Sequence, residues 1–562
     1  MWARHLLFLG VCAAGVWLVG DQLLRRDRVA DPRTARPDRF AGVEEARPWP
    51  DARQPSKDWA ATLGRLNGEF RDHRAKHDLP AAPRADHLTI ARRMSLALVG
   101  TVPSVEEIRA LEAVRPDDRV EWWTSHLLED RRFADYWAER FARMFCPPDI
   151  NPPIIFRRNR FTTWLGDQFA ANTPYNEVVQ KLIAEQGVWT GNPAANFITA
   201  TAQNDKQNQP DPVRLAGRTA RAFLGMRIDC LQCHDDKLGN LSFGTGDSAR
   251  GGTQADFHQL AAFFGSTQFG LVGVYDGNKM YEVQYLDADK EVVVPAKVPF
   301  LDELADGHGT RREQLARWVT HPENKAFARA TVNRAWALLF GQPLVQPIDD
   351  IPLEGPYPPG LELLADDFIA HDFDLQRLIR LITASEVFQL DSRADFEITA
   401  EHEKQWAVFP LTRLRPEQMA GSLSQSAQLE TIDGQAHVVM RIAKFQQIRQ
   451  FVERYGDAGQ DEFTDRAGTI PQRLLMMNGD LVKERTGGNF VASASARIAA
   501  LTNKPEKQVE VAYLATLTRR PSEEELAHFT AQLAGLRGEE RGEAMEDLYW
   551  TLINSTEFSW NH

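Results

Sequence analysis

Cysteine is scarce in this chain, with four in 562 residues, which is too few for a disulfide scaffold in a protein of this length. Positive charge is in the minority, because 65 Lys and Arg against 78 Asp and Glu give a net charge of −13. An acidic surface repels phosphate backbones, so we expect no nucleic-acid partner. The sequence contains no G-x-S-x-G, no H-E-x-x-H and no phosphate-binding glycine loop, and so gives no support to the familiar hydrolase and nucleotide chemistries.

The chain does have the composition of a globular protein, with 43% hydrophobic and 25% charged residues. These proportions exclude a disordered chain, a collagen-like fibre and a polytopic membrane protein. A length of 562 residues corresponds to about three or four domain-sized units.

The N-terminus carries a charge-free stretch, residues 6–20, with Arg4 before it and Arg25 after it. As a helix this stretch would span about 22 Å, less than the roughly 30 Å of a bilayer's hydrocarbon core. Residues 1–28 therefore predict a cleaved secretory signal or an uncleaved, tilted membrane anchor, with a buried N-terminal helix as the third interpretation. The two leading interpretations place the body in the periplasm or at the cell surface, with the N-terminus in contact with the membrane. The proline-rich residues 29–58 predict an extended linker.

From residue 59 onward the hydrophobic pattern is mostly helical. Ser104 and Glu107 predict a capping box at the start of a helix. Three short strands are expected at residues 272–275, 281–285 and 291–294, with turns between them. The predicted fold is mainly α, with two helical domains and a small β-meander inserted between them. The expected divisions are a signal or anchor at 1–28, a linker at 29–58, a first helical domain at 59–270, the meander at 271–305 and a second helical domain at 306–562.

Four aromatic residues recur at intervals of four and predict one buried helix face: Phe133, Trp137, Phe141 and Phe145. Core packing explains such a stripe more readily than a cofactor does.

The most informative residues are Cys230-Leu231-Gln232-Cys233-His234, a C-x-x-C-H motif. On a helical turn, positions i, i+3 and i+4 face the same way. Cys230 and Cys233 could then bond covalently to a haem while His234 supplies an axial imidazole, as in c-type cytochromes. Attachment of this kind takes place outside the cytoplasm, where the N-terminal segment would send the chain. The motif and the N-terminus therefore both favour a haem c cofactor and transfer of electrons to an unidentified redox partner.

Three other interpretations of the motif remain open. Cys230 and Cys233 could form a short structural disulfide in a non-redox surface module that binds a partner or a glycan. They could bind a non-haem metal together with His234, although neighbouring Cys233 and His234 would have difficulty ligating one tetrahedral ion. A metal-dependent enzyme of this kind would use Asp235, Asp236 or His258 beside the motif. They could also be reduced thiols that only pack.

A sixth haem ligand would come from elsewhere in the chain. His258 lies on the helical pattern that follows the motif, and Met280 lies in a turn-rich segment after Asp276-Gly277-Asn278. A Met ligand would give a higher reduction potential than a second His. The plainer interpretation is a half-exposed helix residue for His258 and a strand-end hydrophobic residue for Met280, and it is favoured for both.

The second half carries Asn333 and Arg334 on a predicted helix and Asp349 and Asp350 in a proline-rich loop. These four residues could form a binding site or an ion-pair network that fixes the loop, and the network is the favoured interpretation.

Short motifs spread from residue 60 to the end carry a family resemblance. They include Arg92-Arg93-Met94-Ser95-Leu96, Asn172-Thr173-Pro174-Tyr175, Phe223-Leu224-Gly225-Met226-Arg227, Leu260-Ala261-Ala262-Phe263-Phe264, Val332-Asn333-Arg334-Ala335-Trp336 and Leu517-Thr518-Arg519-Arg520-Pro521. The chain thus resembles the planctomycete-type secreted cytochrome-like family with paired DUF1549 (PSCyt2) and DUF1553 (PSD1) domains.

The chain departs from that family in two respects. Family members usually read C-x-x-C-H-x-H-P, whereas this chain has Asp236 and Lys237 in place of the second His and the Pro. Many members also begin with a separate cytochrome c-like domain, which the short N-terminal segment replaces here. The resemblance therefore implies a single candidate haem site.

Overall fold

The structure is a computed structural model that describes residues 57–146, 157–202, 209–432 (apart from 238, 240, 245 and 286–288) and 494–562, with parts of 433–493. The predicted signal or anchor at 1–28, and the linker at 29–58 except for its last two residues, lie outside the described residues. No helix in the described part of the chain is both long enough and apolar enough to cross a membrane.

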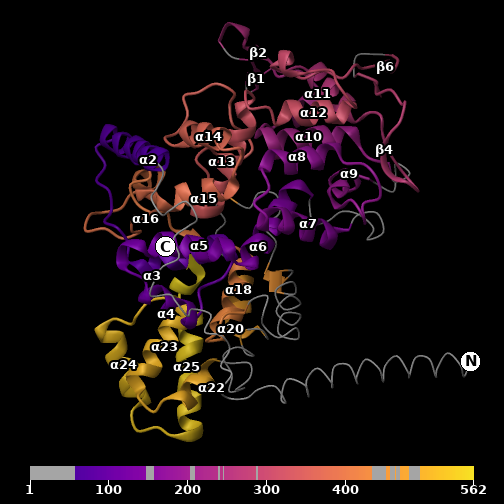
Figure 1. The fold of residues 1–562 in the computed structure, drawn as a ribbon. Coiled ribbons are helices and arrows are strands. Elements are labelled where there is room, and N and C mark those ends of the chain that lie inside the picture. The colour runs from indigo at the N-terminus through magenta and orange to yellow at the C-terminus, as the bar shows by residue number, and fades with distance from the viewer. Residues whose placement is uncertain are drawn as a thin grey trace, which may run out of the picture.

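The fold is mainly α, as predicted (Figure 1). The helices before the middle of the chain are α2 (Lys57–Lys76), α3 (His87–Val99), α4 (Val105–Ala113), α5 (Arg119–Glu129), α6 (Arg131–Phe145), α7 (Arg158–Ala170), α8 (Tyr175–Ala184), α9 (Asn196–Thr199), α10 (Pro212–Thr219) and α11 (Gln254–Ala261). Those that follow are α12 (Arg311–Val319), α13 (Lys325–Phe340), α14 (Leu361–Ala370), α15 (Leu375–Ala384), α16 (Glu386–Gln389) and α17 (Ala400–Lys404). The C-terminal helices are α18 (Pro416–Ser426), α20 (Ile470–Asn478), α22 (Ala494–Leu501), α23 (Pro505–Leu517), α24 (Glu523–Leu533) and α25 (Gly538–Ile553).

Local sequence signals explain where several of these helices begin and end. Ser104 and Glu107 make the predicted capping box at the start of α4, each bonding the backbone N–H of the other. Gly341 closes α13 in the left-handed conformation, with φ of 83°. The four aromatic side chains of α6 are at most 1% exposed, which confirms that their stripe is a core face.

The strands form separate two-stranded antiparallel sheets, in four pairs among the described residues. The pairs are β1 (Ser242–Phe243) with β2 (Arg250–Gly251), β3 (Thr267–Gly270) with β4 (Gly273–Asp276), β5 (Glu282–Val283) with β6 (Val292–Val293), and β7 (Thr412–Arg413) with β8 (Trp560–Asn561). The expectation of one meander was therefore wrong in its pairing. β4 turns back onto β3, which the sequence analysis did not predict, and β5 pairs with β6 alone.

Two hydrophobic clusters form the core. The larger cluster extends from Leu66 to Phe409 and includes side chains from both halves of the chain. The smaller cluster joins the C-terminal helices to side chains of α3 and α4, including Leu96 and Ile108. Helix α3 contributes side chains to both clusters and therefore connects them. Figure 1 shows α10, α11, β1 and β2 at the end of the molecule opposite α22–α25.

Candidate functional site

The chain reaches the C-x-x-C-H motif through an interrupted helix. Asp211 caps α10 by accepting hydrogen bonds from two backbone N–H groups, and the helix continues as a π-type turn over residues 220–224. Gly225 ends it in the left-handed conformation, with φ of 62°. A Cβ atom at Gly225 would lie 3.0 Å from Ile351, so both the backbone conformation and the close approach favour glycine. The motif therefore begins after the helix and not on it.

The motif occupies a short 3-10 turn, η5 (Asp229–Gln232), and the residues directly after it. The backbone N–H groups of Cys233 and His234 both donate to the carbonyl of Cys230, at 3.2 and 3.4 Å. Leu231 is fully buried and anchors the turn, whereas Cys230, Cys233 and His234 are exposed. Both cysteines are free thiols. The turn thus presents two thiols and an imidazole to solvent from one anchored segment.

The imidazole of His234 has a defined orientation. Its Nδ1 lies 2.8 Å from the carbonyl oxygen of Asp235. A carbonyl only accepts, so Nδ1 must carry the proton and donate it, which leaves the lone pair on Nε2. This is the tautomer that a histidine needs in order to ligate iron or another metal through Nε2.

The two acidic residues after the motif hold the backbone around it. Asp235 accepts a hydrogen bond from the backbone N–H of Gln254 at 2.7 Å, at the first residue of α11. Asp236 accepts from the backbone N–H groups of Gly239 and Leu241, at 3.2 and 2.6 Å. Both carboxylates therefore accept hydrogen bonds from backbone N–H groups. Asp236, which replaces the second His of the family pattern, therefore has a structural part here.

The ring of His258 contacts the motif directly, but it contacts a backbone carbonyl of the motif and not a cysteine or histidine side chain. The ring is 3% exposed, so it is buried and not the half-exposed residue considered above. Its Nε2 lies 3.2 Å from the carbonyl oxygen of Gln232 and therefore donates, while Nδ1 accepts from the hydroxyl of Tyr281 at 2.9 Å. Burial lowers the pKa of His258, against a smaller raising effect of the Gln232 hydrogen bond, which favours the neutral ring. Both nitrogens are thus engaged in holding the turn to α11 and to the segment before β5.

Met280 lies two residues before β5, and its side chain is 46% exposed. Its sulfur accepts a contact from Arg311 Nη2 at 3.6 Å. Met280 is therefore at the surface and next in sequence to Tyr281, the partner of His258.

A ready-made metal cluster involving the motif is not present among the described residues. In that part of the chain, three ligand atoms lie within 4.8 Å of one another only at Asp58, Asp367 and His371. Arg377 already bridges that group, with Nη2 at 3.0 Å from Asp58 and 2.8 Å from Asp367. Since a guanidinium fills the place of a cation, this cluster is an ion-pair network.

A second ion-pair network reaches the residue before Cys230, and the sequence analysis did not connect it to the motif. Arg227 Nε lies 2.7 Å from Asp349 Oδ1, and Arg221 Nε lies 2.7 Å from Asp229 Oδ2. Arg221 also approaches Asp349 at 3.5 Å. The loop of the second half is therefore linked by charge to the start of the motif turn.

Asn333 fixes the same loop from inside. It is fully buried, donates to the carbonyls of Val345 and Ile348 at 3.0 and 3.2 Å, and accepts from the N–H of Val345 at 2.9 Å. These contacts support the interpretation of the Asn333 and Asp349 region as a network that fixes the loop.

The donor set of the turn fits a covalently held haem. Thioether bonds require two accessible thiols, which Cys230 and Cys233 supply, and axial ligation requires an open imidazole nitrogen, which His234 supplies. His258 is not open in the same way, because both of its nitrogens already make hydrogen bonds.

Comparison with known proteins returns two family models. Residues 69–269 match PSCyt2, a protein of unknown function (DUF1549), and residues 311–533 match PSD1, a protein of unknown function (DUF1553). Together the two models cover about three quarters of the chain. No curated protein and no solved structure matches it.

Proposed function

Because the chain belongs to the family that pairs a DUF1549 (PSCyt2) domain with a DUF1553 (PSD1) domain, and both are of unknown function, we propose its function from its own residues. The protein is an electron-transfer protein that works outside the cytoplasm and carries one c-type haem on Cys230 and Cys233, with His234 as the axial ligand. The observation that supports this proposal most is the exposure of two free thiols beside an imidazole whose Nε2 lone pair is open.

The residues of the turn suit covalent attachment. In covalent attachment each thiol would add across one vinyl group of the haem, with its sulfur bonding one carbon and its hydrogen going to the other, so the addition would need no oxidant. Leu231 anchors the turn and the His258–Gln232 hydrogen bond fixes its backbone, which keeps the two sulfur atoms on one small segment. A bound haem supplies a one-electron carrier.

The sixth ligand remains a choice between His258 and Met280. Met280 has an exposed thioether, which makes it the simpler candidate. His258 would first have to give up its hydrogen bond to Gln232. The redox partner is unidentified, and the charge-free residues 6–20 support secretion or membrane anchoring in the periplasm or at the cell surface.

The proposal is tested on the full-length protein produced in a periplasm with haem-maturation machinery. Wild type should show a Soret band, about one haem per chain by pyridine haemochrome, and a haem stain that persists after denaturation. Cys230→Ala and Cys233→Ala should each lose the covalent stain. Cys146→Ala is the matched control, because Cys146 is a fully buried free thiol whose pKa burial raises to about 11, so its removal should leave the stain intact. A colourless, folded wild type rules the proposal out.

A second candidate rests on the same exposure of the thiols. Free, accessible cysteines at C-x-x-C spacing can instead close a disulfide or bind a soft metal, in a module that binds a surface partner. The colourless protein should then show either no free thiol at Cys230 and Cys233 or about one metal ion per chain.

A further inference from the structure

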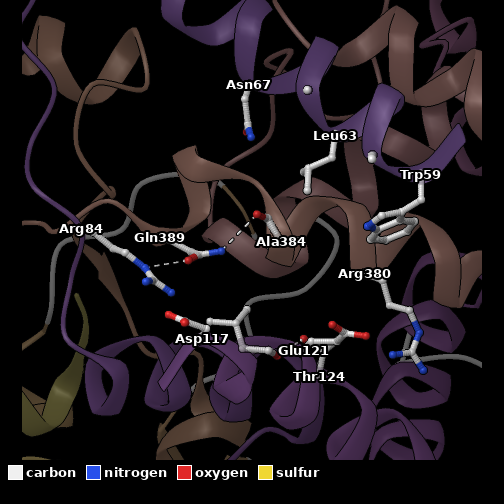
Figure 2. A pocket seen from close by; sticks show the side chains of 13 residues that line it. Trp59, Leu63, Asn67, Arg84, Asp117, Glu121, Thr124, Arg380, Ala384 and Gln389 are labelled. Carbon is white, nitrogen blue, oxygen red and sulfur yellow. Dashed lines mark hydrogen bonds between the residues drawn. The ribbon is translucent and has the colours of Figure 1, made fainter. Parts of the chain in front are cut away.

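A cavity of about 610 Å³ lies between α2, α5 and α15, away from the Cys230–His234 turn. This volume is within the range of about 300–1,000 Å³ that small-molecule sites usually occupy. Figure 2 shows side chains entering it from α2 on one side and from the segment around α5 on the other. Helix α5 lies in the part of the chain that matches PSCyt2, and α15 lies in the part that matches PSD1. The cavity is therefore built where the two family domains meet, which is a common place for a ligand site.

One face of α2 supplies the upper wall in Figure 2. Trp59, Leu63 and Asn67 are spaced at intervals of four, so they lie on one side of the helix. Gly64 also lines the cavity, and a Cβ atom built on it would have no atom within 4 Å. The wall thus combines an indole ring, an aliphatic side chain and an amide with open space beside the helix.

Charged and amide side chains from other elements complete the lining. Arg84 Nε donates to Gln389 Oε1 at 2.9 Å, and Gln389 Nε2 donates to the carbonyl of Ala384 at 3.1 Å. Arg380 is 7% exposed, and its Nη1 donates to Ser125 Oγ at 2.7 Å. Side chains held in this way are already positioned before a ligand enters, which lowers the entropic cost of binding.

The charges of the lining balance one another. Arg84 and Arg380 carry positive charge, and Asp117 and Glu121 carry negative charge. Partial burial raises the pKa of Glu121, against the opposing effect of the Arg380 charge. An anionic ligand would meet the two carboxylates and a cationic ligand the two guanidinium groups, so neither is favoured.

We propose that this cavity binds a neutral saccharide of one or two rings. Sugar hydroxyl groups both donate and accept, so they can bond carboxylates, guanidinium groups and amides in the same site. The apolar C–H face of a sugar ring can pack on the indole of Trp59. A purely apolar ligand would leave the polar lining, including buried Arg380, without compensation for lost water.

The test uses the full-length protein and three neutral probes, cellobiose, maltose and N,N′-diacetylchitobiose, with digalacturonic acid as an anionic probe. Binding is measured by saturation-transfer NMR and by calorimetry. At least one neutral disaccharide should bind, and digalacturonic acid should bind more weakly. Gly64→Leu should weaken that binding about tenfold or more, because its side chain enters the open space of the cavity. Trp59→Ala should weaken it to a similar degree by removing the packing surface.

Gly68→Leu is the matched control for the filling variant. Gly68 is on the same helix, a Cβ atom there also meets nothing within 4 Å, and it is not part of the cavity lining. The affinity of Gly68→Leu for the neutral disaccharide should stay within about twofold of that of wild type. The proposal is overturned if none of the neutral probes binds, if digalacturonic acid alone binds, or if Gly64→Leu binds a neutral probe as tightly as Gly68→Leu does.

Discussion

The arginines of α3 and the residues of the Cys230–His234 turn are both parts of recognisable sequence motifs, yet they lie in opposite environments. Arg92 and Arg93 are at most 1% exposed, whereas Cys230, Cys233 and His234 are exposed. The comparison separates residues that hold the molecule together from residues that are available for chemistry.

The buried arginines make contacts far along the chain. Arg92 donates to the carbonyls of Thr516 and Phe558, both at 3.2 Å. Arg93 donates to the carbonyls of Phe388, Leu390 and His562 at 3.2, 2.6 and 2.6 Å, and its guanidinium carbon lies 3.7 Å from the ring centroid of Phe409. Burial lowers the pKa of Arg92 to about 10 and that of Arg93 to about 9, which reflects the cost of removing these charges from water.

The motif turn makes fewer hydrogen bonds to distant parts of the chain than the arginines of α3 do. Its polar contacts are the ion pair of Asp229 with Arg221 and hydrogen bonds within the turn and to α11, and the thiols themselves are free. A change in α3 should therefore affect stability, and a change in the turn should affect function.

The largest effect is expected for Arg93→Met. The substitution removes three hydrogen bonds and leaves the carbonyls of Phe388, Leu390 and His562 without this donor. We expect a loss of about 3–5 kcal/mol in the free energy of unfolding, measured by urea denaturation. Arg109→Met, at an exposed arginine of α4, should cost less than about 0.5 kcal/mol. Equal losses in the two variants would contradict the role of Arg93.

The second effect concerns the acid stability of the α4 cap. Glu107 is 1% exposed, accepts from the N–H of Ser104 at 2.8 Å and pairs with Arg132. Burial alone would raise the pKa of Glu107, but Arg132, His126 and the Ser104 N–H together hold it well below its usual range. Its stabilisation is thus present above the unfolded pKa of about 4.3 and is lost as the pH falls below it.

Glu107→Gln removes that charge. We expect a loss of about 2–4 kcal/mol at pH 7 and a shallower decline in stability below about pH 4.5 than in wild type. Thermal unfolding across pH 3–7 measures both. Glu129→Gln, at an exposed residue of α5, is the control and should follow the wild-type profile. A Glu107→Gln variant that keeps the full acid slope would show that another group is responsible.

A moderate effect on stability is expected at His258, a buried residue that contacts the exposed motif turn. His258→Phe keeps a ring in place but removes the hydrogen bonds to Gln232 and Tyr281. We expect a loss of about 1–2 kcal/mol and faster amide exchange over residues 228–234. Because both nitrogens of His258 are engaged, covalent haem and its absorption spectrum should be retained. A changed axial-ligand spectrum would identify His258 as the sixth ligand and so contradict this expectation.

The smallest effect on stability is expected in the motif itself. Cys230→Ser and Cys233→Ser change exposed side chains that make no disulfide. Unfolding of the haem-free protein should therefore shift by less than about 0.5 kcal/mol. A loss above about 2 kcal/mol in either variant would mean that the thiols are structural, and the contrast with α3 would disappear.

Local signals in the sequence were enough to predict much of the secondary structure. The capping box at Ser104 and the aromatic face of α6 depend on neighbouring residues, and both are observed. The burial of Arg92 and Arg93 depends on carbonyls about 300 to 470 residues away, which no local pattern contains.

The sequence named the residues of the candidate site but did not predict the local geometry around them. Cys230 lies on a 3-10 turn, and Cys233 and His234 directly follow that turn, because Gly225 ends the preceding helix first. The part that His258 plays could not be read from spacing, since it depends on how α11 packs against the backbone of Gln232. The link from Arg227 to Asp349 likewise joins segments that are distant in the sequence.

The most direct test of the haem assignment is the intact mass of the denatured full-length protein after expression with haem-maturation machinery. We expect a mass increase of one haem per chain in wild type and in Cys146→Ala, and no such increase in Cys230→Ala/Cys233→Ala. A wild-type mass equal to that of the bare polypeptide would contradict it.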